Sequence, residues 1–121
     1  MRSYRELLVY QKSYRQALWM YELTRSFPKE EQYGLASQLR RASTSIPLNI
    51  AEGYGKVEQG KEVVRFLSMA KGSSAELEVL LHFSKDLGYI SEDAYCEAIS
   101  SQEEIGKMLT GLIKSIQAKA C

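Results

Sequence analysis

The feature that most constrains the fold is the spacing of the apolar residues, which recurs with the period of an α-helix along most of the chain. Four segments have this period, at about residues 3–26, 31–54, 60–87 and 91–118. None of them shows the sustained alternation of apolar and polar residues that is typical of a β-strand. The sequence therefore predicts an all-α protein built from four long helices.

The connections between these segments are short, at residues 27–30, 55–59 and 88–90. Gly88 stands where a helix often ends in a residue with a left-handed backbone. Short connections between long helices make consecutive helices antiparallel. We therefore predict a single domain over residues 1–121, folded as an antiparallel up-down-up-down four-helix bundle.

Pro47 stands in the middle of the second predicted helix. A proline removes one backbone hydrogen bond and bends a helix. The apolar positions keep the same helical phase on both sides of it, at Leu39, Ala42, Ile46 and Ile50. We therefore predict one helix that is kinked at Pro47, with the proline ring on its outer side, and we expect Gly53 and Gly55 to end this helix.

A strip of polar residues lies beside the apolar face of the second helix, and a similar interruption occurs in the third. The candidates are Ser45, Asn49 and Glu52 in the second helix and Ser73 and Glu76 in the third. Buried polar groups must be hydrogen-bonded, so we predict that these side chains form a structural network between the two helices. The alternatives are a ligand or catalytic site, exposure to solvent, and a contact between subunits.

The sequence contains no complete motif of a catalytic site, a nucleotide-binding loop or a metal site. Residues 55–61 resemble a phosphate-binding loop, but Glu62 stands where serine or threonine would hold magnesium. The single histidine, His82, supplies neither the ligands of a di-iron site nor a readable catalytic triad. Cys96 and Cys121 have no metal-type spacing and are too few for a disulfide framework. We predict no enzyme activity, with no catalytic residue, cofactor or metal.

The net charge of the chain is only +1, but the charges are unevenly distributed. Residues 1–71 include 12 basic and 7 acidic residues, whereas residues 72–121 include 4 basic and 8 acidic residues. One interpretation is that the basic residues 1–71 form a surface that binds an anionic partner. The alternative is that residues 1–71 and the acidic residues 72–121 face each other within one chain or between chains. No apolar run approaches the roughly 18 residues that cross a bilayer, and the charged N-terminal residues do not suit a signal peptide. We expect a cytoplasmic protein with no membrane partner.

The first helix is apolar on more than one side. Its aromatic residues are Tyr4, Tyr10, Tyr14, Trp19 and Tyr21. Tyrosine and tryptophan suit surfaces that are buried but wet at the edge, such as subunit interfaces. A helix that is apolar on two sides usually has two partners, so we expect one side to pack in the bundle and the other to contact a second subunit.

Three stretches of the sequence resemble a known family: LLVYQKS from Leu7, FPKEEQYGLASQLRRASTSIPLNIAEGYGK from Phe27, and FLSMAKGSSAELE from Phe66. This is the four-helix-bundle family named for proteins encoded in 23S rRNA intervening sequences, which includes the accessory variability proteins of diversity-generating retroelements. The resemblance implies an antiparallel bundle that assembles into a homopentamer. For the retroelement members it also implies binding to a reverse transcriptase and to nucleic acid through basic residues, although those proteins are strongly basic and this chain is nearly neutral.

The first functional hypothesis is a non-enzymatic, homo-oligomeric protein that binds RNA or DNA through basic surface residues. The candidates are Lys12, Arg15, Arg40, Arg41, Lys56, Lys61 and Arg65. We expect Arg40 to reach solvent, and Arg41 to bind either a nucleic acid or, alternatively, Glu52 or a neighbouring subunit. The second hypothesis is a protein-interaction scaffold with a protein partner and no direct contact with nucleic acid, which the aromatic first helix and the near-neutral charge favour.

Overall fold

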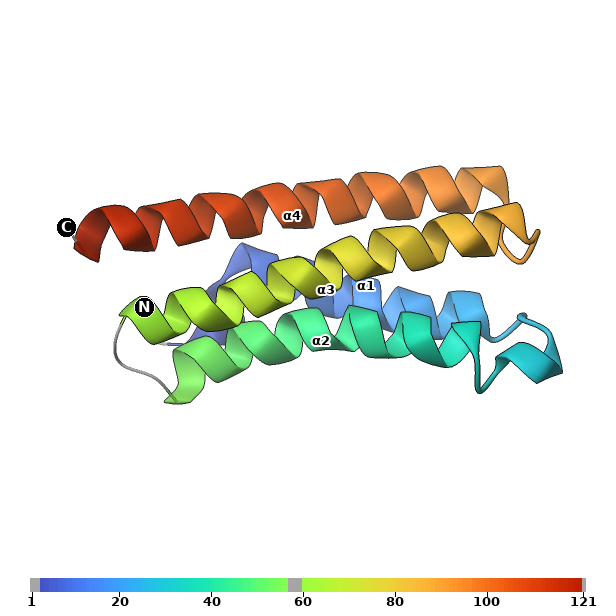
Figure 1. The fold of residues 1–121 in the computed structure, drawn as a ribbon, viewed down its shortest axis with the longest axis horizontal. Helices are drawn as coiled ribbons and strands as arrows, with labels where there is room; N and C mark the ends of the chain where they lie inside the picture. Colours follow the sequence, from blue (N-terminus) through green and yellow to red (C-terminus); the bar gives the residue numbers. More distant parts are fainter. Residues whose placement is uncertain (1–2, 57–59, 121) are drawn as a thin grey trace.

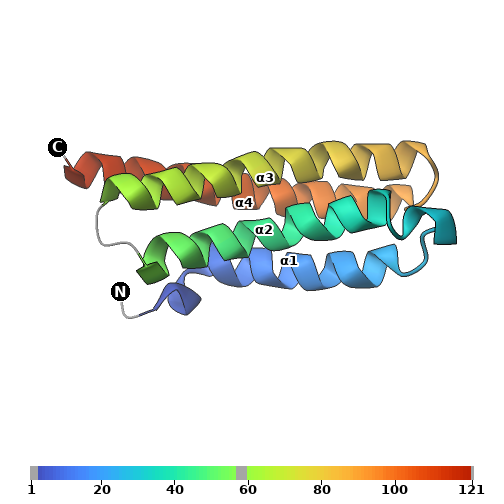
Figure 2. The same cartoon turned by 60° about the horizontal axis from the view of Figure 1, so that its bottom comes forward.

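A computed structural model describes residues 3–56 and 60–120 of the chain, and this part contains helices and no strands. The long helices are α1 (Leu8–Thr24), α2 (Leu35–Lys56), α3 (Gly60–Asp86) and α4 (Glu92–Ala120). Two short 3-10 helices, η1 (Tyr4–Glu6) and η2 (Lys29–Glu31), precede α1 and α2. Consecutive long helices run antiparallel (Figure 1, Figure 2), so the predicted all-α helical bundle is confirmed.

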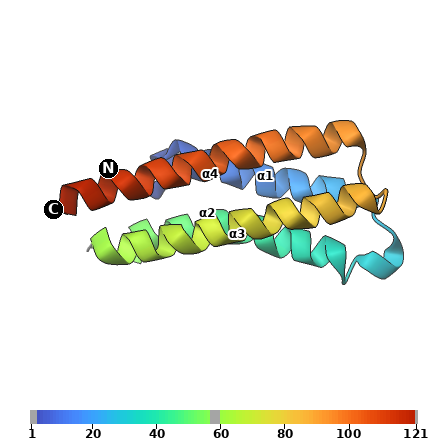
Figure 3. The ribbon, with the colours of Figure 1, turned by 45° about the horizontal axis from the view of Figure 1, so that its top comes forward.

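The four long helices form two antiparallel layers, with α1 and α4 in one and α2 and α3 in the other (Figure 3). Each helix packs against two others: α2 lies between α1 and α3, and α4 lies between α3 and α1. The bundle is therefore square in section, and each pair of neighbouring helices forms one groove on its outside. The candidate interaction surfaces lie in these grooves and on the outer side of α3.

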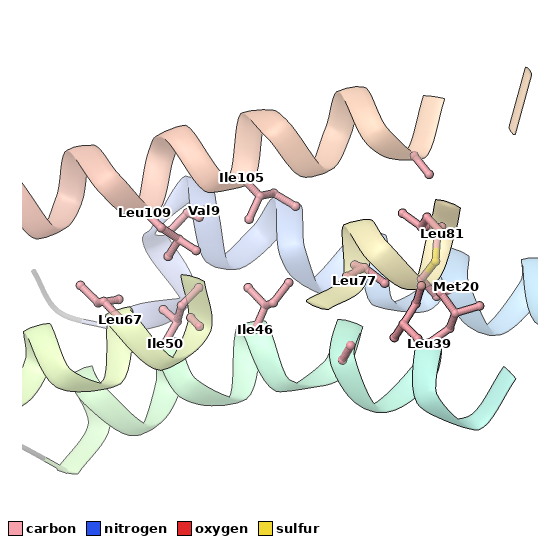
Figure 4. Packing of buried hydrophobic residues seen from close by; sticks show 14 of the residues in the cluster. Val9, Met20, Leu39, Ile46, Ile50, Leu67, Leu77, Leu81, Ile105 and Leu109 are labelled. Carbon is pink, nitrogen blue, oxygen red and sulfur yellow. The ribbon is translucent and has the colours of Figure 1, made fainter. Parts of the chain in front are cut away.

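The hydrophobic core runs along the axis of the bundle and takes aliphatic side chains from every long helix (Figure 4). Side chains fully shielded from solvent include Met20, Leu39, Ile46, Ile50, Leu67, Leu77, Leu81, Ile105 and Leu109. Full burial of one such side chain stabilises a fold by about 1.5–3 kcal/mol relative to leaving it exposed. Within a helix their spacing is four, seven or ten residues, which is the helical period that predicted the four helices.

The helix α2 runs through Pro47 without interruption, as predicted, and the kink at Pro47 stays a prediction. The half-buried proline lines the groove between α1 and α2, on the outside of the bundle. The expectation that Gly53 ends this helix is wrong, because α2 continues to Lys56. A Cβ atom on Gly53 would lie only 3.1 Å from the Cβ of Phe66, so the glycine lets α2 and α3 approach closely.

The segment predicted as one helix over residues 3–26 is divided in the structure. Leu7 has an extended backbone, with φ −70° and ψ 129°, between η1 and α1. Local hydrogen bonds hold η1 in place: Ser3 Oγ accepts from the backbone N–H of Arg5 at 3.1 Å, and Gln11 Nε2 donates to the Arg5 carbonyl at 2.9 Å. These side chains satisfy backbone groups that a continuous helix would otherwise pair.

The connection between α3 and α4 has the form that the sequence predicts. Gly88 has a left-handed backbone, with φ +78°, and the N–H of Tyr89 donates to the carbonyl of Ser84 at 2.9 Å. Ser91 caps the start of α4, because its hydroxyl accepts a hydrogen bond of 3.0 Å from the N–H of Ala94. This tight turn fixes the two helices side by side and so defines the groove between them.

Candidate interaction surfaces

The basic residues predicted to bind nucleic acid do not share one surface, and two of them are paired within the chain. Lys12 forms an ion pair of 3.4 Å with Glu104 of α4. Arg65 forms an ion pair of 3.0 Å with Glu62 and lies over the ring of Phe66. The hydrogen bond from Arg65 to Glu62, together with the charge of that carboxylate, raises the pKa of Arg65 above its usual value.

Arg15 and Arg41 are exposed, and neither makes an ion pair or hydrogen bond within the part of the chain that the structure describes. Arg15 lines a groove of about 470 Å³ between α1 and α4. Arg41 lines a groove of about 470 Å³ between α2 and α3, on the other side of the bundle. The side chains of Lys56 and Lys61 lie outside the described residues. The described candidates are therefore dispersed over different grooves.

Arg40 is half-buried, and its guanidinium group is not left free in solvent. Its Nε donates to Thr24 Oγ1 and its Nη2 donates to Gln32 Oε1, each at 2.9 Å. The guanidinium carbon also lies 5.5 Å from the centre of the Tyr21 ring. Gln32 Nε2 in turn donates to the carbonyls of Thr24 and Phe27, each at 3.0 Å. Arg40 thus connects the end of α1 to α2, so its role is structural.

The structure brings together three of the five residues predicted to form a polar network. The hydroxyl groups of Ser45 and Ser73 share a hydrogen bond of 2.8 Å between α2 and α3. Asn49 Nδ2 donates to the carbonyl of Ser45 at 2.9 Å and to its hydroxyl at 3.1 Å. Glu76 is exposed at the same groove, and Glu52 is half-buried one turn beyond Asn49. The bonds among the three residues align α2 with α3.

A second polar group lies deeper in the bundle and was not predicted as a network. Gln102 of α4 is fully buried and donates through Nε2 to the hydroxyl of Ser74 on α3. Gln16 of α1 is also buried and donates to Ser101 Oγ at 3.4 Å. The Oε1 atoms of both glutamines are buried without a partner among the described residues. The sequence signal was a glutamine inside the apolar stripe of the fourth predicted helix.

An exposed groove between α1 and α2, here named the α1–α2 groove, is lined by apolar and aromatic side chains and by Thr44, and by no charged side chain among the described residues. Its volume is about 400 Å³. The side chains that form most of it are Tyr10, Tyr14, Leu18, Tyr21, Pro47 and Leu48. Leu18 is 56% exposed and Leu48 is 64% exposed. The sequence predicts two apolar sides for the first helix, a main stripe that includes these three tyrosines and Leu18, and a second side with Leu8, Trp19 and Leu23. The exposed groove is formed by the main stripe, whereas Trp19 and Leu23 pack against the core.

A separate apolar surface, here named the α3 stripe, consists of Val79, Phe83 and Leu87. Val79 and Phe83 lie on one side of α3, and Leu87 directly follows the helix, where its N–H donates to the carbonyl of Phe83 at 2.9 Å and so continues the helical turn. Each is more than half exposed, whereas the nearby Leu77 and Leu81 are fully buried in the core. Single exposed apolar residues are common, but a contiguous set is a feature of interaction surfaces. Sequence reasoning missed this stripe, although its spacing is visible in the sequence.

The described residues contain no group of three or more histidine, cysteine, aspartate or glutamate side chains arranged to hold a metal ion. His82 lies 3.4 Å from Asp86 on the surface of α3, and Cys96 is exposed on α4. Across residues 3–56 and 60–120, no helix combines the length and apolar character that spanning a membrane requires.

Comparison with known proteins identifies relatives by sequence and by fold. The solved structure of a protein of unknown function from the S23 ribosomal protein family of Bacteroides thetaiotaomicron superposes with a TM-score of 0.81 at 26% sequence identity. The superposition covers 88% of this chain and 96% of that one. No curated protein matches the sequence. The profile of a family described as 23S rRNA-intervening sequence protein matches residues 5–111. The chain belongs to this family.

Proposed function

We propose that the chain is a non-enzymatic, cytoplasmic protein that assembles with copies of itself, the α1–α2 groove of one copy receiving the α3 stripe of the next. The observation that carries this is the presence of two exposed apolar surfaces on one chain. Apolar side chains at four-residue intervals are what a helix presents to a hydrophobic groove. Burial of apolar area contributes roughly 25 cal/mol per Å², so covering both surfaces favours association.

The two surfaces are different, and this determines the kind of assembly. A contact between unlike surfaces is heterologous, so each copy keeps one groove and one stripe for further copies. Such contacts repeat from copy to copy and either close into a ring or extend into a filament. The homopentamer that the family resemblance implies is a closed form of this kind.

The experiment is a measurement of molar mass by light scattering during size-exclusion chromatography. The wild-type chain is compared with Leu18→Glu, which places a charge in the α1–α2 groove. The matched control is Tyr33→Glu, because Tyr33 is 97% exposed and outside both surfaces. We expect an oligomer for the wild type and the control, and a monomer for Leu18→Glu. A wild-type chain that is monomeric at micromolar concentration contradicts self-association.

A second candidate function is nucleic-acid binding, which the family description and the free guanidinium groups of Arg15 and Arg41 favour. Each phosphate contact contributes about −0.9 to the slope of log K against log salt for duplex DNA. The double variant Arg15→Gln with Arg41→Gln should therefore bind RNA and DNA more weakly and lower the slope by about 2 for each copy in contact. An unchanged slope, with the exposed Arg25→Gln as control, points instead to a protein partner without nucleic-acid contact.

A further inference from the structure

The groove between α3 and α4 differs from the α1–α2 groove because charged side chains line it. Its volume is about 570 Å³, within the range of ligand sites. Lys71, Lys107 and Lys114, here named the lysine trio, line it together with Glu78 and Glu103, here named the carboxylate pair. Within the described residues, none of these five side chains makes an ion pair. Their charges are therefore available to a ligand.

The register of the two helices separates the two kinds of charge along the groove. Ser74 of α3 accepts a hydrogen bond from Gln102 of α4, and its hydroxyl lies 3.8 Å from the point that a Cβ on Gly106 would occupy. Because α3 and α4 are antiparallel, Glu78 lies on the side of this contact that is nearer the turn at Gly88, and Glu103 lies level with the contact, between Gln102 and Gly106. The lysine trio lies on the far side. The groove thus passes from a basic end to the carboxylate pair.

Glycines in α4 leave the basic part of this groove open. Gly106 and Gly111 line it, and a Cβ on Gly111 would meet no atom within 4 Å. Glycine weakens the interior of a helix relative to alanine, so neither position helps α4 to form. Their effect is to let a ligand approach the helix backbone beside the lysine trio.

We propose that this groove binds a nucleotide unit, with its phosphate at the lysine trio and its base at the carboxylate pair. Lysine is a common phosphate-binding residue, and three lysines along one groove suit a dianionic or diester phosphate. A carboxylate accepts hydrogen bonds from the amino group of a base, as it does from cytosine N4. The same chemistry is offered by a free nucleotide and by a nucleotide within an RNA strand.

This site is independent of the self-association proposed above, because its residues belong neither to the α1–α2 groove nor to the α3 stripe. It places a nucleotide contact on residues other than Arg15 and Arg41. The carboxylate pair also determines which base is favoured. Cytosine presents an amino group where uracil presents a carbonyl oxygen, and a carbonyl facing a carboxylate leaves two acceptors opposed. The groove therefore prefers cytidine to uridine nucleotides.

The experiment is a titration followed by amide NMR shifts and by calorimetry, with CMP, UMP and ribose 5-phosphate as ligands. Filling the groove is tested with Gly111→Gln, because the open space at Gly111 admits a side chain without disturbing the core. The control is Gly72→Gln, at an exposed glycine that also meets no atom within 4 Å and does not line the groove. Lys107→Gln tests the basic end, with the exposed Lys29→Gln as its control.

We expect CMP to bind about tenfold more tightly than UMP or ribose 5-phosphate, an ordinary effect of one hydrogen bond to a charged group. Gly111→Gln and Lys107→Gln should each weaken CMP binding about tenfold or more, and the two controls should leave it unchanged. Equal affinities for CMP and ribose 5-phosphate would overturn the proposal that the carboxylate pair binds the base. CMP binding that survives Gly111→Gln, or no binding at millimolar CMP, overturns the site.

The source of the nucleotide is distinguished with single-stranded oligocytidylate. Tighter binding of the oligonucleotide than of CMP, lost in Gly111→Gln, supports a nucleotide within RNA. Equal affinities support a free nucleotide. The molar mass of every variant is measured in the same samples. Self-association is therefore tested even if the groove binds no nucleotide, and nucleotide binding is tested even if the chain is monomeric.

Discussion

Arg40 Nε donates a hydrogen bond of 2.9 Å to Thr24 Oγ1, which ties α2 to the last residue of α1. Thr24 is fully buried, and its hydroxyl in turn donates to the carbonyl of Met20 at 2.7 Å. The second bond from Arg40 reaches Gln32 in the connection between the two helices. One guanidinium group on α2 therefore satisfies an acceptor at the end of α1 and a second acceptor within the α1–α2 connection.

Replacing Arg40 with alanine should destabilise the fold by about 2 kcal/mol, because it removes two hydrogen bonds from a charged donor and leaves Thr24 Oγ1 and Gln32 Oε1 without that donor. The measurement is urea unfolding followed by circular dichroism. The neighbouring change Arg41→Ala is the control, and it should alter stability by no more than about 0.5 kcal/mol because Arg41 is exposed. Equal effects of the two changes would contradict the structural role of Arg40.

Two glycines in helices should respond to alanine in opposite directions. Gly53→Ala should destabilise the bundle by about 1–3 kcal/mol, because the new Cβ would lie 3.1 Å from the Cβ of Phe66 and push α2 from α3. Gly72→Ala should stabilise it by about 0.5–1 kcal/mol, because an added Cβ there meets nothing and alanine is the better helix former. Thermal unfolding checks both. A stabilising Gly53→Ala would show that the helices separate without cost.

The buried pair Gln102 and Ser74 predicts a non-additive result. Gln102 Oε1 is buried without a partner in the described part of the chain, which costs about 1–3 kcal/mol. Replacing both residues, with Gln102→Leu and Ser74→Ala, removes every buried polar atom of the pair. The double variant should be at least as stable as the wild type, and more stable than the sum of the single effects predicts. A double variant that loses more than about 2 kcal/mol in urea unfolding would show that the pair stabilises the core.

Stability should fall at alkaline pH through two tyrosines. Burial raises the pKa of Tyr54. Burial, the hydrogen bond that Tyr89 donates to Glu31 at 3.2 Å, and the nearby carboxylates of Glu31 and Glu30 raise the pKa of Tyr89. Because the pKa of each tyrosine in the folded state lies above the ordinary tyrosine value of 10.0, the stabilisation is fully present below about pH 10 and is lost as the pH rises through the folded-state pKa.

The variant Tyr89→Phe tests this dependence. It removes one of the two titrating groups, so the fall in stability above pH 10 should become shallower than in the wild type. The measurement is urea unfolding at a series of pH values from 7 to 11. The exposed change Tyr33→Phe serves as the control, and an identical pH profile for Tyr89→Phe and the wild type would contradict the coupling to Glu31.

Much of the fold is predictable because it depends on local order along the chain. Residues such as Leu39, Ile46 and Ile50 recur with the helical period, so their burial follows from the sequence alone. The role of Arg40 does not follow, because Thr24 and Gln32 meet it only once α1 and α2 have a definite register. Gly53 is ambiguous for a similar reason. A glycine suits both a helix end and a close approach, and only the position of Phe66 decides between them.

The candidate surfaces were predictable to a lesser degree. That the first helix has two apolar sides is visible in the sequence, but which side faces outward is not: Tyr14, Leu18 and Tyr21 of its main stripe line the exposed groove, and Trp19 and Leu23 pack against the core. The α3 stripe is less evident, because Val79 and Phe83 alternate with buried Leu77 and Leu81 in one apolar run. Which of these residues face outward depends on the side of α3 that packs against α2 and α4.

The most direct test of self-association is to mix two variants that are defective in different surfaces. Leu18→Glu disables the α1–α2 groove, and Phe83→Glu disables the α3 stripe. If the groove of one copy binds the stripe of the next, each variant alone is monomeric and their mixture forms a heterodimer, through the intact groove of Phe83→Glu and the intact stripe of Leu18→Glu. Sedimentation velocity of the two variants, separate and mixed, measures this. A mixture that stays monomeric, or a Phe83→Glu variant that still assembles like the wild type, would contradict the groove-and-stripe contact.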